Sequence, residues 1–130
     1  MADKIILLDT SILIDYFRKK DKNKTAFFNL SNSYSGFKIS VLTEYEIYSG
    51  AKKEQYEYWR DVLKLIPIVT LDSEIIKTAV EINNELKKSN KQLAIADLFI
   101  AATAIKLNLP CATLNAKHFQ RVENLELVIP

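Results

Sequence analysis

Short apolar runs alternate with longer segments of helical periodicity along this chain of 130 residues. The first run, from Ile5 to Leu8, has four consecutive apolar residues, a pattern typical of a strand covered on both faces. Strands that alternate with helices pair in parallel, because each helix supplies the crossover between them. The alternation predicts an α/β fold with a central, mostly parallel sheet of about four to five strands, flanked by helices on both sides.

The predicted strands and helices follow one another without a linker or an internal repeat. We expect strands at residues 5–8, 37–40, 68–71, 111–114 and 127–129. We expect helices at residues 11–20, 24–34, 41–52, 55–65, 72–89 (with Asp72 as its N-cap), around Asp97 to 107, and a short turn of helix at 117–121. A chain of this length forms about one domain, so residues 1–130 are expected to be a single domain.

The rarity of glycine, histidine and cysteine excludes several classes of site. Two glycines, Gly36 and Gly50, cannot supply the glycine-rich loops that hold nucleotide phosphates. Cys111 has no cysteine partner for an internal disulfide, and with His118 as the lone histidine it cannot form a zinc cluster. Any metal site in this chain must therefore use oxygen ligands.

Composition and charge indicate the expected surroundings of the protein. No apolar run reaches the roughly 18 residues that a membrane span needs, and the run from Ile5 to Leu8 is too short for a secretory signal. With its single cysteine, the chain is expected to be cytoplasmic and to have no membrane association. The net charge of +2 is not that of a polycation, but five basic residues gather at Arg18, Lys19, Lys20, Lys22 and Lys24. Taken alone, this group fits a solvated loop better than a patch that binds RNA phosphates.

Two acidic residues occupy positions that require an explanation. Asp97 lies in the most apolar stretch of the chain, where burying an unpaired carboxylate would cost several kcal/mol. Contact with a helix N-terminus would return only about 0.3 to 1 kcal/mol. Asp9 ends the first strand, and ligands of parallel sheets bind outside the carboxyl ends of the strands. A helix cap is an equally good explanation of Asp9 taken alone.

Glu46 has two explanations that the sequence leaves open. Thr43 and Glu46 have the spacing of a capping box, in which both side chains bind backbone N–H groups at a helix start. If Ser40 is the cap instead, Thr43 and Glu46 lie on one face of the helix. Further along the chain, Ala101 and Ala104 share the face of Asp97, and such small residues would let that helix approach the sheet closely.

Four groups of residues, in this order, resemble the motifs of one family. They are Leu7-Leu8-Asp9-Thr10-Ser11, Ser40-x-x-Thr43-x-x-Glu46-x-x-x-Gly50, Ala96-Asp97-x-x-Ile100-Ala101-Ala102-x-Ala104 and Thr113-x-Asn115-x-x-His118-Phe119. Together they resemble a PIN-domain ribonuclease of the VapC toxin type, over almost the whole chain. The resemblance implies a three-layer PIN-like fold with an acidic pocket at the C-terminal edge of the sheet.

The family's functional residues carry over to matching positions of this chain. Asp9, Glu46 and Asp97 match the catalytic acids that bind metal, and the hydroxyls that support them match Thr10, Ser11 and Thr43. Asn115 stands where the family often has a fourth acid, and it offers an oxygen without a charge. The resemblance therefore implies one Mg²⁺ or Mn²⁺ ion and disfavours a stable second ion.

A VapC-type toxin is a metal-dependent endoribonuclease that hydrolyses RNA phosphodiester bonds, forms a homodimer and is silenced by a cognate VapB-like antitoxin. Under this resemblance, the basic residues at 18–24 and His118 are candidates to contact RNA, although a structural role is favoured for His118 taken alone. Aromatic residues that could contact a protein partner, or belong to the core, are Tyr45, Tyr48, Tyr56, Tyr58 and Trp59.

Other functional classes remain to be separated from this one. A PIN-like module that binds RNA or protein without turnover is an alternative, with Asn115 as the residue that weakens catalysis. A phosphotransferase of the haloacid dehalogenase kind needs a second Asp two residues after the first, where this chain has Ser11. A response-regulator receiver needs an acid beside Asp9 and a lysine after the strand that precedes Asn115, and the chain has neither.

Overall fold

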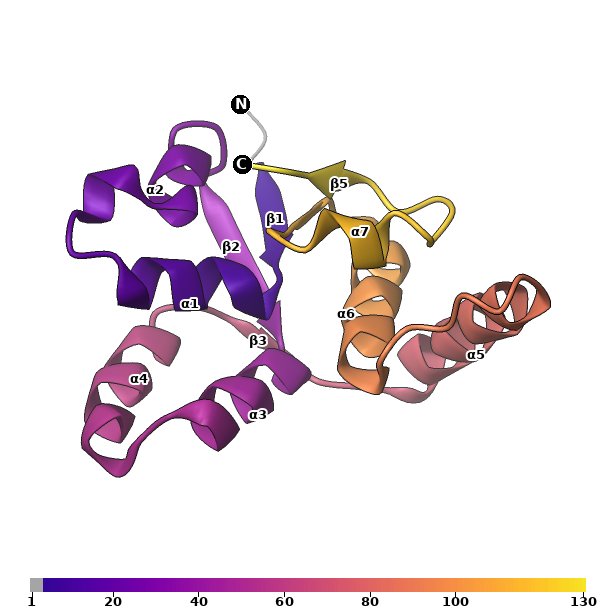
Figure 1. Ribbon diagram of the computed structural model, residues 1–130, viewed down its shortest axis with the longest axis horizontal. Helices are drawn as coiled ribbons and strands as arrows, with labels where there is room; N and C mark the ends of the chain where they lie inside the picture. The colour runs from indigo at the N-terminus through magenta and orange to yellow at the C-terminus, as the bar shows by residue number, and fades with distance from the viewer. Residues whose placement is uncertain (1–3) are drawn as a thin grey trace.

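Five parallel strands form the centre of the computed structural model, which describes residues 4–130 (Figure 1). The strand order is β3-β2-β1-β4-β5, and every neighbouring pair is parallel. Their bounds are β1 (Ile5–Leu8), β2 (Gly36–Ser40), β3 (Ile68–Val69), β4 (Cys111–Ala112) and β5 (Leu127–Val128). The three-layer α/β fold with a parallel sheet is therefore confirmed.

Strand β1 shows why its sequence is apolar throughout. It lies in the middle of the sheet, and Ile6, Leu7 and Leu8 are all fully buried. Successive side chains of a strand point to opposite faces, so Ile6 and Leu8 join the core on one side of the sheet and Leu7 joins the core on the other. A central strand covered on both faces has no position for a polar side chain.

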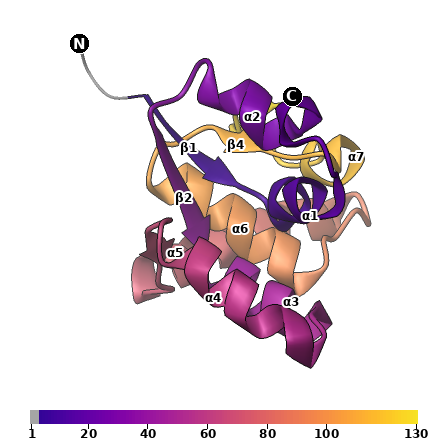
Figure 2. The ribbon, with the colours of Figure 1, turned by 90° about the vertical axis from the view of Figure 1, so that its left-hand side faces the viewer.

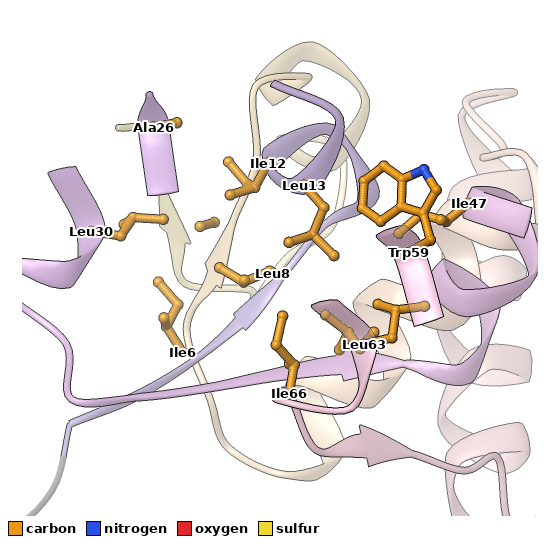
Figure 3. Close-up of a cluster of buried hydrophobic side chains, with 12 residues drawn as sticks. Ile6, Leu8, Ile12, Leu13, Ala26, Leu30, Ile47, Trp59, Leu63 and Ile66 are labelled. Carbon is orange, nitrogen blue, oxygen red and sulfur yellow. The ribbon is translucent and has the colours of Figure 1, made fainter. Parts of the chain in front are cut away.

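Four helices cover the first face of the sheet: α1 (Thr10–Arg18), α2 (Ala26–Ser31), α3 (Val41–Gly50) and α4 (Tyr56–Leu63). Figure 2 shows this layer from its outer side, with α1 and α2 above α3 and α4. Beneath it, Ile12 and Leu13 of α1 pack with Leu30, Trp59 and Leu63 (Figure 3). Burial of these large side chains provides most of the stabilisation of this layer, at about 1.5 to 3 kcal/mol for each fully buried one.

The other face is covered by α5 (Ser73–Lys88), α6 (Ile95–Lys106) and α7 (Ala116–Phe119) (Figure 1). Ala101 and Ala104 of α6 are fully buried in one cluster with Leu7 and Cys111 of the sheet. Small side chains at these positions allow the helix to lie close to the strands, as their spacing predicted. This close packing brings the first turn of α6 near the C-terminal end of β1.

Several predicted bounds differ from the observed ones. The helix expected at 24–34 is divided into a 3₁₀ turn, η1 (Lys22–Lys24), and α2, because Thr25 interrupts it as an N-cap that accepts a hydrogen bond from Phe28 N. A second 3₁₀ turn, η2 (Lys53–Gln55), precedes α4. Asp72 caps α5 as predicted, with Ile75 N donating to Asp72 Oδ1 at 2.9 Å.

The predicted aromatic group is divided between core and surface. Trp59 is 2% exposed and packs against Phe17, whereas Tyr45 is 67% exposed. Tyr56 and Tyr58 lie between these extremes. Trp59 is therefore a core residue, and Tyr45 is available at the surface. Within residues 4–130, no helix combines the length and the apolar character that crossing a membrane would require.

Candidate active site

One cavity of about 500 Å³ contains most of the polar residues that the sequence singled out. Asp9 enters it from the end of β1, Glu46 from the middle of α3 and Asp97 from the first turn of α6. These segments are distant in sequence and meet at the C-terminal edge of the sheet. The other predicted residues that line this cavity are Thr10, Ser11, Arg18, Lys19 and Asn115.

Asp9 is held in place by two hydroxyl groups. Its side chain is nearly buried, and its Oδ2 accepts hydrogen bonds from Ser11 Oγ at 2.7 Å and Thr113 Oγ1 at 2.8 Å. Asp9 occupies the N-cap position of α1, but its carboxylate accepts no backbone N–H of that helix. Capping of α1 therefore does not explain why an acid stands at position 9. The second oxygen of the carboxylate, Oδ1, takes no part in the two bonds with the hydroxyls.

The same hydroxyls connect two ends of neighbouring strands. Leu114 N donates to Ser11 Oγ at 3.0 Å, and Asn115 N donates to Thr113 Oγ1 at 2.9 Å. The loop after β4 is thus fixed to the loop after β1 through Asp9. Thr113 is fully buried. The sequence-based prediction gave Thr113 no role, because it placed Thr113 inside a strand at residues 111–114, whereas β4 ends at Ala112.

The structure resolves the two explanations of Glu46. Ser40 is the N-cap of α3, with Leu42 N donating to Ser40 Oγ at 3.0 Å, so no capping box involves Thr43 and Glu46. Thr10 Oγ1 instead lies 2.7 Å from Glu46 Oε1 and 3.0 Å from Thr43 Oγ1. A hydroxyl has one proton, so Thr10 donates to the carboxylate and accepts from Thr43. Glu46 is thereby oriented from α1.

Asp97 is an acid whose pKa is raised by its surroundings. Its side chain is 20% exposed, and His118 Nδ1 lies 3.3 Å from its Oδ2. Burial raises the pKa of Asp97 above its ordinary value, and the charge of Asp9 raises it further, while His118 opposes both effects. Asp9 and Asp97 are therefore close enough to repel each other. No lysine or arginine within residues 4–130 forms an ion pair with Asp97.

The donor atoms around the cavity have the chemistry that a hard divalent cation prefers. Asp9, Glu46 and Asp97 offer carboxylate oxygens, and Asn115 offers a carbonyl oxygen. In the part of the chain that the structure describes, no three acidic, imidazole or thiolate side chains are already drawn together as a ligand cluster. The residues thus fit Mg²⁺ or Mn²⁺ in type, and binding would require their side chains to turn further into the cavity.

The basic residues at 18–24 do not act as one group. Arg18 and Lys19 line the cavity, and Lys19 also pairs with Asp15 at 3.0 Å. The ammonium group of Lys22 instead binds carbonyl oxygens at the end of α1, including that of Lys19 at 2.8 Å, and lies over the Tyr16 ring. Lys20 and Lys24 are exposed outside the cavity. The structure therefore brings only Arg18 and Lys19 to the acids.

Comparisons with known proteins agree with this arrangement. The model of the family described as "PIN domain" matches residues 6–125. "Ribonuclease VapC1" of Methanocaldococcus jannaschii is 38% identical over 95% of this chain and 85% of its own length. "Ribonuclease VapC" of Rickettsia bellii is 32% identical over 95% of this chain and 94% of its own length.

Solved structures give the same result for the fold. A toxin-antitoxin complex from Klebsiella pneumoniae contains a chain that is 31% identical, with a TM-score of 0.79 over 96% of this chain and 97% of that one. VapBC2 from Rickettsia felis, bound to a promoter DNA fragment, contains a chain that is 26% identical, with a TM-score of 0.80 over 95% of this chain and 97% of that one. This chain therefore belongs to the PIN-domain family and, within that family, to the VapC-like proteins.

Proposed function

We propose that this chain is a metal-dependent endoribonuclease that hydrolyses RNA phosphodiester bonds as the toxin of a toxin–antitoxin pair. The observation that carries the proposal is the meeting of Asp9, Glu46 and Asp97, from three separate elements, around one cavity. The curated relatives bear the name ribonuclease VapC, which supports the same reaction class.

The three acids, with Asn115, are the residues that would hold Mg²⁺ or Mn²⁺. When bound, such an ion would activate a water molecule for attack and stabilise negative charge on the phosphoryl oxygens. The free Oδ1 of Asp9 and the free Oε2 of Glu46 are the atoms best suited to this role, since Ser11, Thr113 and Thr10 already occupy the opposite oxygens.

The remaining residues of the cavity prepare it for a negatively charged substrate. Four carboxylates line the cavity, those of the three candidate acids and of Asp15, and they would repel RNA phosphates. Arg18 and Lys19 at the cavity reduce that repulsion, although Lys19 also pairs with Asp15. The hydroxyls of Thr10, Ser11 and Thr113 hold the carboxylates of Asp9 and Glu46 at the cavity before any ligand binds. No residue of the cavity is assigned to the recognition of a particular base.

The antitoxin is proposed on the evidence of the relatives and of one apolar surface. Several of the similar solved structures are complexes of toxin with antitoxin. In this chain, a separate, largely apolar cavity of about 430 Å³ lies between α1, α2, β2 and α4, and Leu13, Phe27 and Val62 line it. Leu65 at its rim is 83% exposed. A partner with apolar side chains would cover this surface. A homodimer is inferred from the VapC resemblance alone.

Cleavage of RNA by the purified chain tests the proposed function. We expect cleavage with Mg²⁺ or Mn²⁺, loss of cleavage with a chelator, and loss of cleavage in Glu46→Gln. Glu44→Gln is the matched control, because Glu44 lies on the same helix outside the cavity. If Mn²⁺ raises the melting temperature of the chain but no RNA is cut, the chain is instead a PIN-like binding module.

A further inference from the structure

A third cavity, of about 410 Å³, lies between α7 and the segment that leads from α5 into α6. Three of its five lining residues are cations, and none is acidic: it is lined by Asn90, Lys91, Lys117, Gln120 and Arg121. Within residues 4–130, none of the three cations forms an ion pair. The cavity is therefore a local concentration of positive charge with no carboxylate in its lining.

The backbone that carries these cations is held in place. Asn90 has a positive φ of 55° and ends α5, and Lys91 N donates to Leu86 O at 2.9 Å, which fixes where Lys91 leaves the helix. On the other side, Arg121 Nη1 donates to Gln92 O at 3.1 Å. This bond connects the segment after α7 to the segment before α6. The two walls of the cavity are thus joined independently of any ligand.

The cavity adjoins the candidate active site through α7. Lys117 is the neighbour of His118, which contacts Asp97, and Asn115 at the start of α7 lines the acidic cavity. In Figure 1, α1 leaves the C-terminal end of β1 to the left, whereas α7 and the segment before α6 lie to the right. Arg18 is the last residue of α1. Basic residues therefore flank the acids on two sides.

Three acids line a neighbouring cavity rather than this one. Glu81, Glu85 and Glu123 line a different cavity, which shares only Arg121 with the basic one. Glu85 is paired with Lys88 at 2.8 Å. The charge of Arg121 is therefore divided between the two cavities, and Lys91 and Lys117 are the cations that belong to the basic cavity alone.

We propose that Lys91, Lys117 and Arg121 form a phosphate-binding subsite for the backbone of single-stranded RNA whose scissile bond lies at the acidic cavity. This subsite rests on the proposed ribonuclease function and deepens it. An RNA strand that crosses an acidic site is stabilised by cations on both sides of it, and Arg18 and Lys19 supply only one side. Position beside the acids favours RNA over an acidic protein segment as the occupant.

The test compares two double variants with the same change in charge. Lys91→Gln with Lys117→Gln removes two cations from the cavity, and Lys53→Gln with Lys64→Gln removes two exposed cations far from it. Both pairs are made in an Asp97→Asn background to prevent cleavage. Binding of a fluorescent single-stranded RNA of about 20 nucleotides, longer than one such binding surface covers, is followed by anisotropy over a range of salt concentrations.

We expect the Lys91 and Lys117 variant to bind about tenfold more weakly at low salt, with a salt-dependence slope smaller by about 1.4, the value for two phosphate contacts on a single strand. The control pair should change neither quantity by a comparable amount. An equal slope in the two double variants overturns the subsite, and so does an absence of RNA binding by the background protein.

Two further measurements separate this inference from other possibilities. Cleavage of the same RNA by the native chain is an independent readout: its absence overturns the proposed ribonuclease, whereas an unchanged slope overturns the subsite alone. A fluorescent polyglutamate peptide identifies the other class of occupant. If the cavity variant loses the peptide but keeps the RNA slope, the cavity binds acidic protein segments and the RNA subsite is wrong.

Discussion

His118 Nδ1 lies 3.3 Å from Asp97 Oδ2, so the single histidine of the chain contacts the acid that stands in its most apolar segment. This relationship joins α7 to the first turn of α6. It also places His118 beside one of the candidate catalytic acids. Two roles of His118 can therefore be tested separately: holding the carboxylate of Asp97, and binding RNA.

Replacing His118 should impair cleavage without unfolding the protein. The imidazole is 54% exposed, so His118→Ala leaves little core disturbed, but Asp97 loses a group that steadies its carboxylate. Residues that orient metal ligands typically account for about 10- to 100-fold in metal affinity or activity, and a loss in this range is expected in cleavage and in Mn²⁺ affinity by calorimetry. His118→Asn, which keeps a donor near the position of Nδ1, should recover part of both. Equal values for all three proteins would contradict this role.

Asp97→Asn should abolish cleavage and raise stability at neutral pH. Burial and Asp9 raise the pKa of Asp97, so the native state binds this proton more tightly than the unfolded state does. The stability from this group is present at acidic pH and is lost as pH rises through the folded pKa, above the ordinary value of 3.8. The melting temperature of Asp97→Asn should therefore exceed that of the native protein at neutral pH, and the difference should be smaller near pH 4. Asp61→Asn, at an exposed site, is the control, and a less stable Asp97→Asn at neutral pH would refute the expectation.

Thr113→Val should destabilise the protein through Asp9. Valine keeps the shape of threonine but removes a hydroxyl that donates to the buried carboxylate at 2.8 Å and accepts from Asn115 N. Leaving such groups without a partner costs about 1 to 3 kcal/mol, to be measured by urea unfolding. Thr113→Ser should lose much less, because it retains the hydroxyl. The control Thr70→Val is at an exposed position, and a loss no greater than that of this control would show that the hydroxyl contributes little.

Asn108 is expected to respond oppositely to glycine and to alanine. It follows the end of α6 with a φ of 55°, where Leu109 N donates to Ala104 O at 2.9 Å. Alanine in this left-handed conformation should lower the free energy of unfolding by about 1 kcal/mol, and glycine should leave it unchanged or raise it. Alanine at Asn84, within the exposed side of α5, should instead be neutral or stabilising. Equal effects of the two substitutions at Asn108 would argue against this geometry.

Much of the fold followed from the sequence because its signals were local. The buried run at β1 and the cap at Asp72 needed only short-range patterns. The helix expected at 24–34 extends only over Ala26–Ser31, because Thr25 is its N-cap. Ala26 N donates to Asp15 Oδ2, eleven positions earlier in the chain. A hydrogen bond between residues eleven positions apart produces no periodic pattern from which the sequence could predict it.

The candidate site could be anticipated by residue type but not in its connections. Asp9 and Asp97 were notable for position and context, whereas the contact of His118 with Asp97 depends on how α7 packs on α6. The assignment of Lys22 to RNA depended on its charge, but in the folded chain its ammonium group binds carbonyl oxygens at the end of α1. Composition alone does not distinguish a lysine that binds backbone carbonyl oxygens from one that binds a ligand.

The acids at positions 9, 46 and 97 follow β1, β2 and β3 respectively along the chain, and they line one cavity together with residues that follow β4. A chain still being synthesised has no such cavity until α6 and β4 have emerged and β4 has paired with β1. An interrupted translation product that ends before α6 would therefore carry two of the acids and no active centre. For a protein whose proposed activity destroys RNA, that activity would thus require most of the chain to have been made.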